Sequence, residues 1–187
     1  MNLFLDTVSP QNVLILFNNN KKIIKKYFFD VRLNESTKLI EELDIFLKSN
    51  NINYSQLENL VVVNWPGSFT GIRTTVLIIN TINFIINKNI TRINYFDLFE
   101  DYPIIKVSSK RDSFLKISKN NEIEIFQNLE LENILNKKNI DKIFWDAPLF
   151  NNITINNVID YEKIILNIIF DNKKIISPFY IKKPTIS

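Results

Sequence analysis

The chain has 187 residues, of which 45% are hydrophobic and 23% are charged, and its formal net charge is +3. These values are ordinary for a globular protein with a buried core, and the charge is too small to indicate nucleic-acid binding by itself. The sequence contains no histidine and no cysteine. It therefore excludes imidazole or thiolate metal sites, a Ser-His-Asp triad and a Cys-His pair, and any catalysis would have to use carboxylates, lysine, tyrosine or a bound nucleotide.

The first part of the chain predicts an α/β unit. Short apolar runs bounded by polar turns predict strands, and apolar residues that recur with a helical period predict helices. In chain order we expect strands at 3–5, 13–17 and 23–29, a helix at 34–48, a strand at 60–63, a helix at 72–87 and a strand at 90–93. This order indicates helices packed on a mixed sheet.

The pattern restarts after a break at 97–103 and predicts a second, smaller α/β unit. We expect strands at 104–107, 114–117 and 123–126, a helix at 129–138, a strand at 142–145 and a last helix at 161–170. The predicted domains are therefore residues 1–100 and residues 101–187. No apolar run is long enough to span a membrane, and the first residues lack the basic start and cleavage site of a signal peptide.

Both glycines of the chain lie in the segment NWPGSFTGIR, between the predicted strand at 60–63 and the predicted helix at 72–87. Backbone amides at such a turn can bind an anion. A phosphate-binding P-loop, however, needs lysine after its second glycine, where this chain has Ile72, and a nucleophile elbow needs a base that is absent here. The residues favour a structural turn. In it, Gly67 or Gly71 adopts a conformation or contact that only glycine tolerates, and Ser68 or Thr70 caps the helix.

The segment PGSFTGIR resembles the signature of the TsaB family, which reads G-P-G-S-F-T-G-L-R and also lies between a strand and a helix. The opening LFLDT, the first-helix residues Ser36 and Leu39, and the closing PFYIKK are similar to the same family. The chain departs from the pattern at Trp65, which replaces the first glycine, and along the following helix, where larger side chains replace glycine and alanine. The aspartate of the family's D-A-R segment is absent.

The resemblance implies the α/β actin-like ATPase (ASKHA) fold, with two small lobes of which the second is reduced. It implies a non-catalytic cytoplasmic scaffold subunit without metal or cofactor. Such a subunit forms a heterodimer with the catalytic paralogue TsaD and works with the ATPase TsaE in the synthesis of threonylcarbamoyladenosine in tRNA. Direct contact with tRNA and a homodimer of the isolated chain are both left open. The alternative function is a small actin-fold ATPase or phosphotransferase that uses Asp6.

Two sets of residues follow from the motif and the fold. The first set is the motif loop, which we expect to be architectural and which comprises Pro66, Gly67, Ser68, Phe69, Thr70, Gly71 and Arg73. The second is the pair Asp6 and Thr7, at the strand end where actin-like ATPases approach phosphate. No glycine-rich loop follows these two residues, so we favour a polar strand end at which Thr7 bonds to the turn.

The helix at 72–87 carries the prediction of a partner surface. At about 100° per residue one broad apolar face can cover the sheet, and it comprises Ile72, Val76, Ile78, Ile79, Ile82, Ile85 and Ile86. Leu77 and Phe84 lie together on the other side, edged by Thr74 and Thr81. The pattern alone is consistent with cover by the chain's own first helix or by another protein. The family resemblance favours a four-helix interface with a partner, through residues 35–48 and 72–87. The residues expected in this interface are Ser36, Leu39, Ile45, Arg73, Leu77, Asn80, Thr81 and Phe84.

Overall fold

The computed structural model describes residues 1–30, 35–67, 69–144, 154–156 and 158–179. The chain divides into two compact units, of which the first combines Met1–Tyr95 with the chain from Tyr161 onward and the second is Phe96–Asp160. This division corrects the predicted boundary, because the last helix belongs to the first unit. The reason is tertiary: the sheet of the first unit brings the Phe4 ring to 5.7 Å from that of Tyr161.

The first unit is built on a five-stranded mixed sheet with the order β3-β2-β1-β4-β5. Its strands are β1 (Asn2–Asp6), β2 (Asn12–Phe17), β3 (Ile23–Phe29), β4 (Asn59–Trp65) and β5 (Asn89–Asn94). The three N-terminal strands pair antiparallel as a meander, whereas β1 with β4 and β4 with β5 are parallel. The helices of this unit are α1 (Glu35–Ser49), α2 (Phe69–Ile86) and α4 (Tyr161–Asn167), with a 3-10 turn η1 (Tyr54–Gln56).

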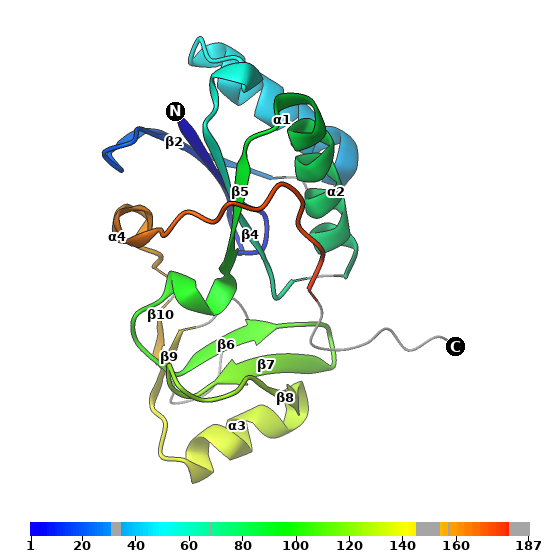
Figure 1. The fold of residues 1–187 in the computed structure, drawn as a ribbon. Helices are drawn as coiled ribbons and strands as arrows, with labels where there is room; N and C mark the ends of the chain where they lie inside the picture. The colour runs from blue at the N-terminus through cyan, green and yellow to red at the C-terminus, as the bar shows by residue number, and fades with distance from the viewer. Residues whose placement is uncertain (31–34, 68, 145–153, 157, 180–187) are drawn as a thin grey trace. The chain divides into compact units, whose positions relative to one another are not determined.

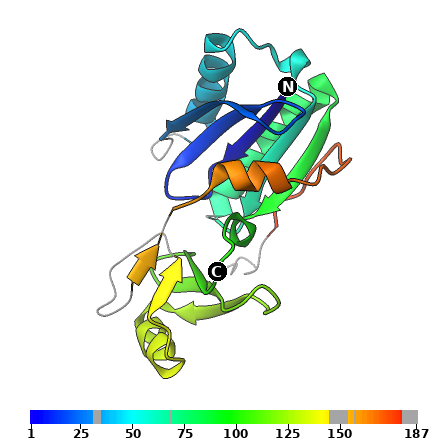
Figure 2. The same cartoon turned by 90° about the vertical axis from the view of Figure 1, so that its left-hand side faces the viewer.

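Helices cover both faces of this sheet. Figure 1 shows α1 and α2 side by side on one face, and Figure 2 shows α4 in front of the opposite face. Leu5 and Val62 point toward α1 and α2 and share a core with Leu43 and Ile79 of these helices. Because the central strands are buried on both faces, they carry continuous apolar runs such as LVVV rather than an alternating pattern.

The second unit has its own five-stranded sheet, with the order β10-β9-β6-β7-β8. The elements are β6 (Ile104–Val107), β7 (Asp112–Lys116), β8 (Glu124–Gln127), α3 (Asn128–Lys137), β9 (Lys142–Phe144) and β10 (Thr154–Asn156), after a 3-10 turn η2 (Tyr95–Leu98). The core of this unit forms where Leu131 and Leu135 of α3 pack on Ile105 and Ile143 of the sheet. The sequence analysis missed β10, because three residues of the polar stretch NNITINN carry no strand pattern.

The chain returns to the first unit with α4, which ends at Asn167 rather than at the predicted position 170. Residues 171–179, which we call the terminal strap, run past β5 and along α2 (Figure 1). The Ile90 amide donates to the Lys173 carbonyl over 2.7 Å, so the strap adds one antiparallel bridge to the edge of β5. Within the described ranges, no helix combines the length and the apolar character needed to cross a bilayer.

Candidate protein-interaction surface

The motif loop lies between the end of β4 at Trp65 and the start of α2 at Phe69. Neither glycine has a positive φ, so of the two predicted alternatives, a special conformation or a close contact, the structure excludes the left-handed conformation. Gly67 is instead constrained by a contact, since a Cβ atom at this position would lie 3.3 Å from the Ile72 side chain and 3.4 Å from Val8. Ser68, one of the two predicted caps, lies outside the described residues.

The strand end at Asp6 is occupied by the chain's own hydrogen-bond donors. The Asp6 carboxylate is buried, with 0% exposure. Its Oδ1 accepts the amides of Val8 (2.8 Å) and Ser9 (2.9 Å). Its Oδ2 accepts the Ser9 hydroxyl at 2.5 Å and the Tyr161 hydroxyl at 3.2 Å. Asp6 therefore closes the turn after β1, whereas Thr7, expected to do so, bonds to Thr75 of α2 at 2.8 Å.

Tyr161 remains protonated in this arrangement. Burial, and then the charge and hydrogen bond of Asp6, raise the pKa of Tyr161 far above its ordinary value near 10. A protonated phenol and a carboxylate that already accepts four hydrogen bonds present no ligand set for a metal. No group of three or more carboxylates capable of holding a metal ion occurs in the part of the chain that the structure describes.

The α2 helix has one buried side and one exposed apolar strip. Ile72, Val76 and Ile79 are buried against the sheet. Leu77 is 67% exposed and Phe84 is 91% exposed, so α1 of the same chain does not cover them. This observation excludes cover by the first helix, the alternative that the sequence left open. Ile85 was assigned to the buried face, and this assignment was wrong because it is 79% exposed.

The other predicted interface residues differ in exposure. Arg73, Thr81 and, on α1, Ile45 are exposed. Leu39 is only 1% exposed and belongs to the core, so its placement in an interface was wrong. The side chain of Ser36 lies outside the described residues.

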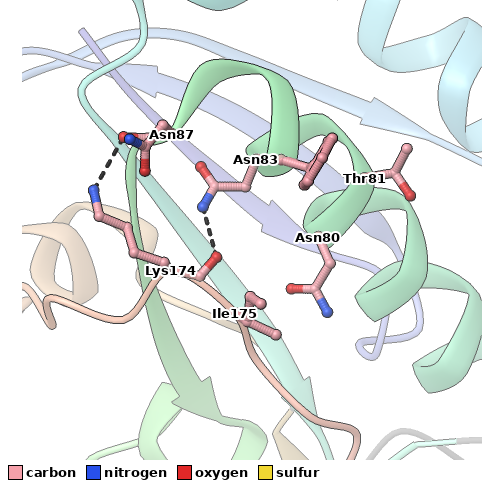
Figure 3. Close-up of a pocket in the computed structure, with 7 residues that line it drawn as sticks. Asn80, Thr81, Asn83, Asn87, Lys174 and Ile175 are labelled. Atoms are coloured by element: carbon pink, nitrogen blue, oxygen red, sulfur yellow. Dashed lines mark hydrogen bonds between the residues drawn. The ribbon is translucent and has the colours of Figure 1, made fainter.

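Asn80 is half-buried, and its amide binds the terminal strap. Its Oδ1 accepts the Ile176 amide at 3.0 Å, and its Nδ2 donates to the Ile176 carbonyl over 2.8 Å. Asn80 was predicted to contact a partner protein, whereas its amide group is engaged within the chain. Figure 3 shows Asn80 and Asn83 of α2 on the side that faces Lys174 and Ile175.

A pocket of about 450 Å³ lies between the C-terminal end of α2 and the strap, beside the hydrogen bonds that join them. Its lining residues are Asn80, Thr81, Asn83, Phe84, Asn87, Lys174 and Ile175. Asn83 donates to the Lys174 carbonyl over 2.7 Å, and the Lys174 ammonium donates to the Asn87 carbonyl over 3.0 Å (Figure 3). The sequence analysis missed the strap residues because they are far from α2 in the sequence. Lys174 is 91 positions from Asn83 and 87 positions from Asn87. A buried asparagine inside an apolar helix, Asn83, was the one available signal.

Solved structures of other proteins share this arrangement of strands and helices. One solved structure, described as an uncharacterized protein with similarity to the peptidase YeaZ from Pseudomonas aeruginosa, matches with a TM-score of 0.68 and 10% identity. That match covers 97% of this chain and 100% of the other. YeaZ from Pseudomonas aeruginosa itself matches with a TM-score of 0.57 and 12% identity over 67% of each chain. The chain has the actin-like fold of YeaZ.

Sequence comparison adds one relative. The uncharacterized protein MG208 of Mycoplasma genitalium is 25% identical over 208 aligned positions, which cover 97% of this chain and 95% of that protein. No family model matches the chain. The shared fold places the turn between β4 and α2, and the exposed strip of α2, in a YeaZ-like framework.

Proposed function

We propose that this protein is a non-catalytic scaffold subunit that pairs with a TsaD-like catalytic subunit in the synthesis of N6-threonylcarbamoyladenosine in tRNA. The observation that carries the proposal is the exposed strip of α2, Leu77 and Phe84, directly after a TsaB-like motif in a YeaZ-like fold. Apolar side chains aligned on one helix, with the short Thr81 between them, favour close packing of another helix.

The chemistry at Asp6 supports a non-catalytic role. An ATPase or phosphotransferase of this fold would need this carboxylate for a metal or for phosphate. Here two amides and two hydroxyls already donate to Asp6, and the group is buried. Three of these donors belong to the turn after β1 and the fourth is Tyr161 of α4, so freeing the carboxylate for a ligand would require both the turn and α4 to move. The alternative enzymatic function is therefore not favoured. In the proposed complex a TsaE-like ATPase supplies nucleotide hydrolysis and the TsaD-like subunit supplies the metal site.

Pairing with the TsaD-like protein of the same genome tests the proposal. The two proteins are co-expressed and purified through a tag on the catalytic subunit, with the scaffold as wild type, Leu77→Asp or Phe84→Asp. Burying an unpaired carboxylate in a protein contact costs about 3 kcal/mol or more, so each variant should lose at least about 100-fold in affinity. Circular dichroism should show a folded monomer, because both side chains are exposed.

Leu129→Asp is the matched control. Leu129 is an exposed helical leucine of α3, 91% exposed, in the second unit, and the same charge at this position should leave pairing unchanged. The proposal is wrong if wild type does not co-purify with the catalytic protein, or if both α2 variants pair like wild type. Unfolding of the α2 variants would also contradict it, because that result would make Leu77 and Phe84 part of the core.

A further inference from the structure

The terminal strap (residues 171–179) is held mainly through its peptide backbone. Asn80 forms two hydrogen bonds with Ile176, one to its N–H and one to its carbonyl, as a neighbouring β-strand would. Asn83 binds the Lys174 carbonyl at 2.7 Å, and Asn64 donates to the Ser177 carbonyl over 3.2 Å. Recognition of this kind fixes the path of a chain without reading most of its side chains.

Additional backbone contacts fix the start of the strap on β5. The Asp171 amide donates to the Thr91 hydroxyl over 2.8 Å, next to the bridge between Ile90 and Lys173. Strand β5 is the edge of its sheet, and an edge strand offers unpaired amides and carbonyls to any extended segment. The strap therefore occupies a position that an added strand could also occupy.

Two side chains anchor the strap. Ile176 is 3% exposed and packs in the core beneath α2, whereas its neighbour Ile175 is 73% exposed. The Phe179 ring meets Trp65 edge to face, with the ring centroids 4.8 Å apart. One buried isoleucine and one aromatic contact add specificity to the backbone contacts.

The groove that receives the strap is formed by elements that have their own support. Asn83 accepts the Lys88 amide at 2.8 Å and donates to the Lys88 carbonyl over 2.9 Å. These two bonds join the end of α2 to the start of β5 and orient the Asn83 amide independently of the strap. Strands β4 and β5 and helix α2 belong to the main core of the unit. The donors and acceptors of the groove should therefore stay in place when the strap leaves.

We propose that Asn64, Asn80, Asn83, Ile90 and Thr91 form a peptide-binding groove, and that the terminal strap is its ligand in cis, released and rebound as a unit. A segment with one deeply buried side chain opens at a lower free energy than the core does. The groove remains filled because an attached segment acts at an effective concentration of the order of millimolar. Its ligand class is an extended peptide that carries an isoleucine anchor, with an aromatic residue three positions later.

Peptide binding to the full chain tests the groove. The variant Ile176→Asp should release the strap, because a carboxylate cannot enter the core site. A fluorescent peptide with the sequence of residues 171–179, DNKKIISPF, should bind this variant and not wild type, whose groove is filled. Adding Asn80→Asp replaces the N–H donor to the Ile176 carbonyl by a carboxylate oxygen, which repels the carbonyl oxygen, so affinity should fall about tenfold. The matched control is Asn133→Asp, at an exposed position of α3, and it should leave the affinity unchanged.

Amide hydrogen exchange of the wild-type protein provides a second, independent measurement. We expect the Ile176 amide to exchange through a local opening, at a lower free energy than the Val62 amide of β4. The proposal is overturned if Ile176 exchanges only together with Val62. It is also overturned if folded Ile176→Asp protein fails to bind the peptide, or binds it equally well with Asn80→Asp. If Ile176→Asp does not fold, the comparison of Ile176 and Val62 exchange in the wild-type protein tests the release of the strap.

Discussion

The buried Asp6 carboxylate shows how a single residue determines the character of a strand end. Removing a carboxylate from water is unfavourable unless hydrogen bonds replace its hydration. Here the turn after β1 and the first residue of α4 supply those donors. The bond from Tyr161 joins two parts of the chain that are 155 positions apart. Asp6 therefore stabilises the attachment of α4 to the sheet.

Replacing Tyr161 should change the response of stability to alkaline pH. The pKa of Tyr161 is raised in the folded state by burial first and by Asp6 second, above its unfolded value of 10.0. Its contribution is therefore complete below about pH 10 and is lost as pH rises further, because only the unfolded state releases the proton. Wild type should lose up to about 1.4 kcal/mol of unfolding free energy per pH unit above pH 10 through this group.

Urea denaturation at pH 8 and at pH 11 checks this expectation. Tyr161→Phe should be about 1 kcal/mol less stable than wild type at pH 8, because Asp6 loses one hydrogen bond. The difference should shrink or reverse at pH 11. The lysines and the other tyrosines titrate in both proteins, so they do not affect the comparison. Parallel pH profiles for the two proteins would show that the Tyr161 proton is not linked to folding.

The substitution Gly67→Ala should lower the unfolding free energy only slightly. The φ of Gly67 is not positive, so alanine is compatible with the backbone. The new methyl group would lie 3.3 Å from Ile72 and 3.4 Å from Val8, so those side chains must shift slightly. Overpacking of about 1 kcal/mol is partly offset by a gain of about 0.4–1 kcal/mol from the less flexible unfolded chain. The unfolding free energy should therefore fall by less than about 1 kcal/mol. Gly67→Val, which adds two further carbon atoms at the same contact, should cost clearly more in the same denaturation experiment.

At the scale of the element, α2 carries large apolar residues on more than one side, and burial distinguishes these sides. The helix carries aliphatic residues toward the sheet, toward its flanks and on its exposed strip. Asn80 and Asn83 occupy the side that receives the strap. In the protein without a partner, α2 exposes several large apolar side chains, and such exposure supports a role in association with another protein.

Alanine substitutions at two isoleucines of α2 should separate these sides. Ile79 is 1% exposed and Ile85 is 79% exposed. Ile79→Ala removes packed atoms from the core and should cost about 2–4 kcal/mol of unfolding free energy. Ile85→Ala should change it by less than about 0.5 kcal/mol. Thermal or urea denaturation of both variants checks the difference, and equal losses would mean that Ile85 is buried in solution.

At the scale of the whole molecule, the chain leaves the first unit after Tyr95 and returns to it at Tyr161. Each unit has a five-stranded sheet and its own apolar core. The α4 helix completes the first unit by covering one sheet face, and the terminal strap then adds to the β5 edge. Docking of α4 joins residues far apart in the sequence, such as Asp6 and Tyr161, and such contacts slow folding.

The isolated protein should not hydrolyse ATP. With magnesium present, phosphate release should stay at the level of a buffer control, because the Asp6 carboxylate is engaged by internal donors. Asp6→Ala should leave this background unchanged and should destabilise the fold, since buried donors lose their acceptor at about 1–3 kcal/mol for each unsatisfied group. Metal-dependent turnover that disappears in the Asp6→Ala protein would contradict the expectation.

The sequence by itself determined the local elements and the fold class. Apolar runs such as LVVV and the period of α1 and α2 depend on neighbouring residues, so β1 to β9 were predicted within a few positions. Helical spacing also separated Leu77 and Phe84 from the sheet-facing side of α2, although it left open whether α1 covers them.

Only the tertiary structure decided which surfaces meet. The partner of Tyr161, the burial of Leu39 and the exposure of Ile85 depend on how helices pack on the sheet, and helical spacing does not encode that packing. The strap is the clearest example, because most of its hydrogen bonds to α2 and the sheet use backbone amides and carbonyls, which do not differ between residue types. A sequence therefore contains no side-chain pattern that would connect Ile176 with Asn80, and the fold alone brings them together.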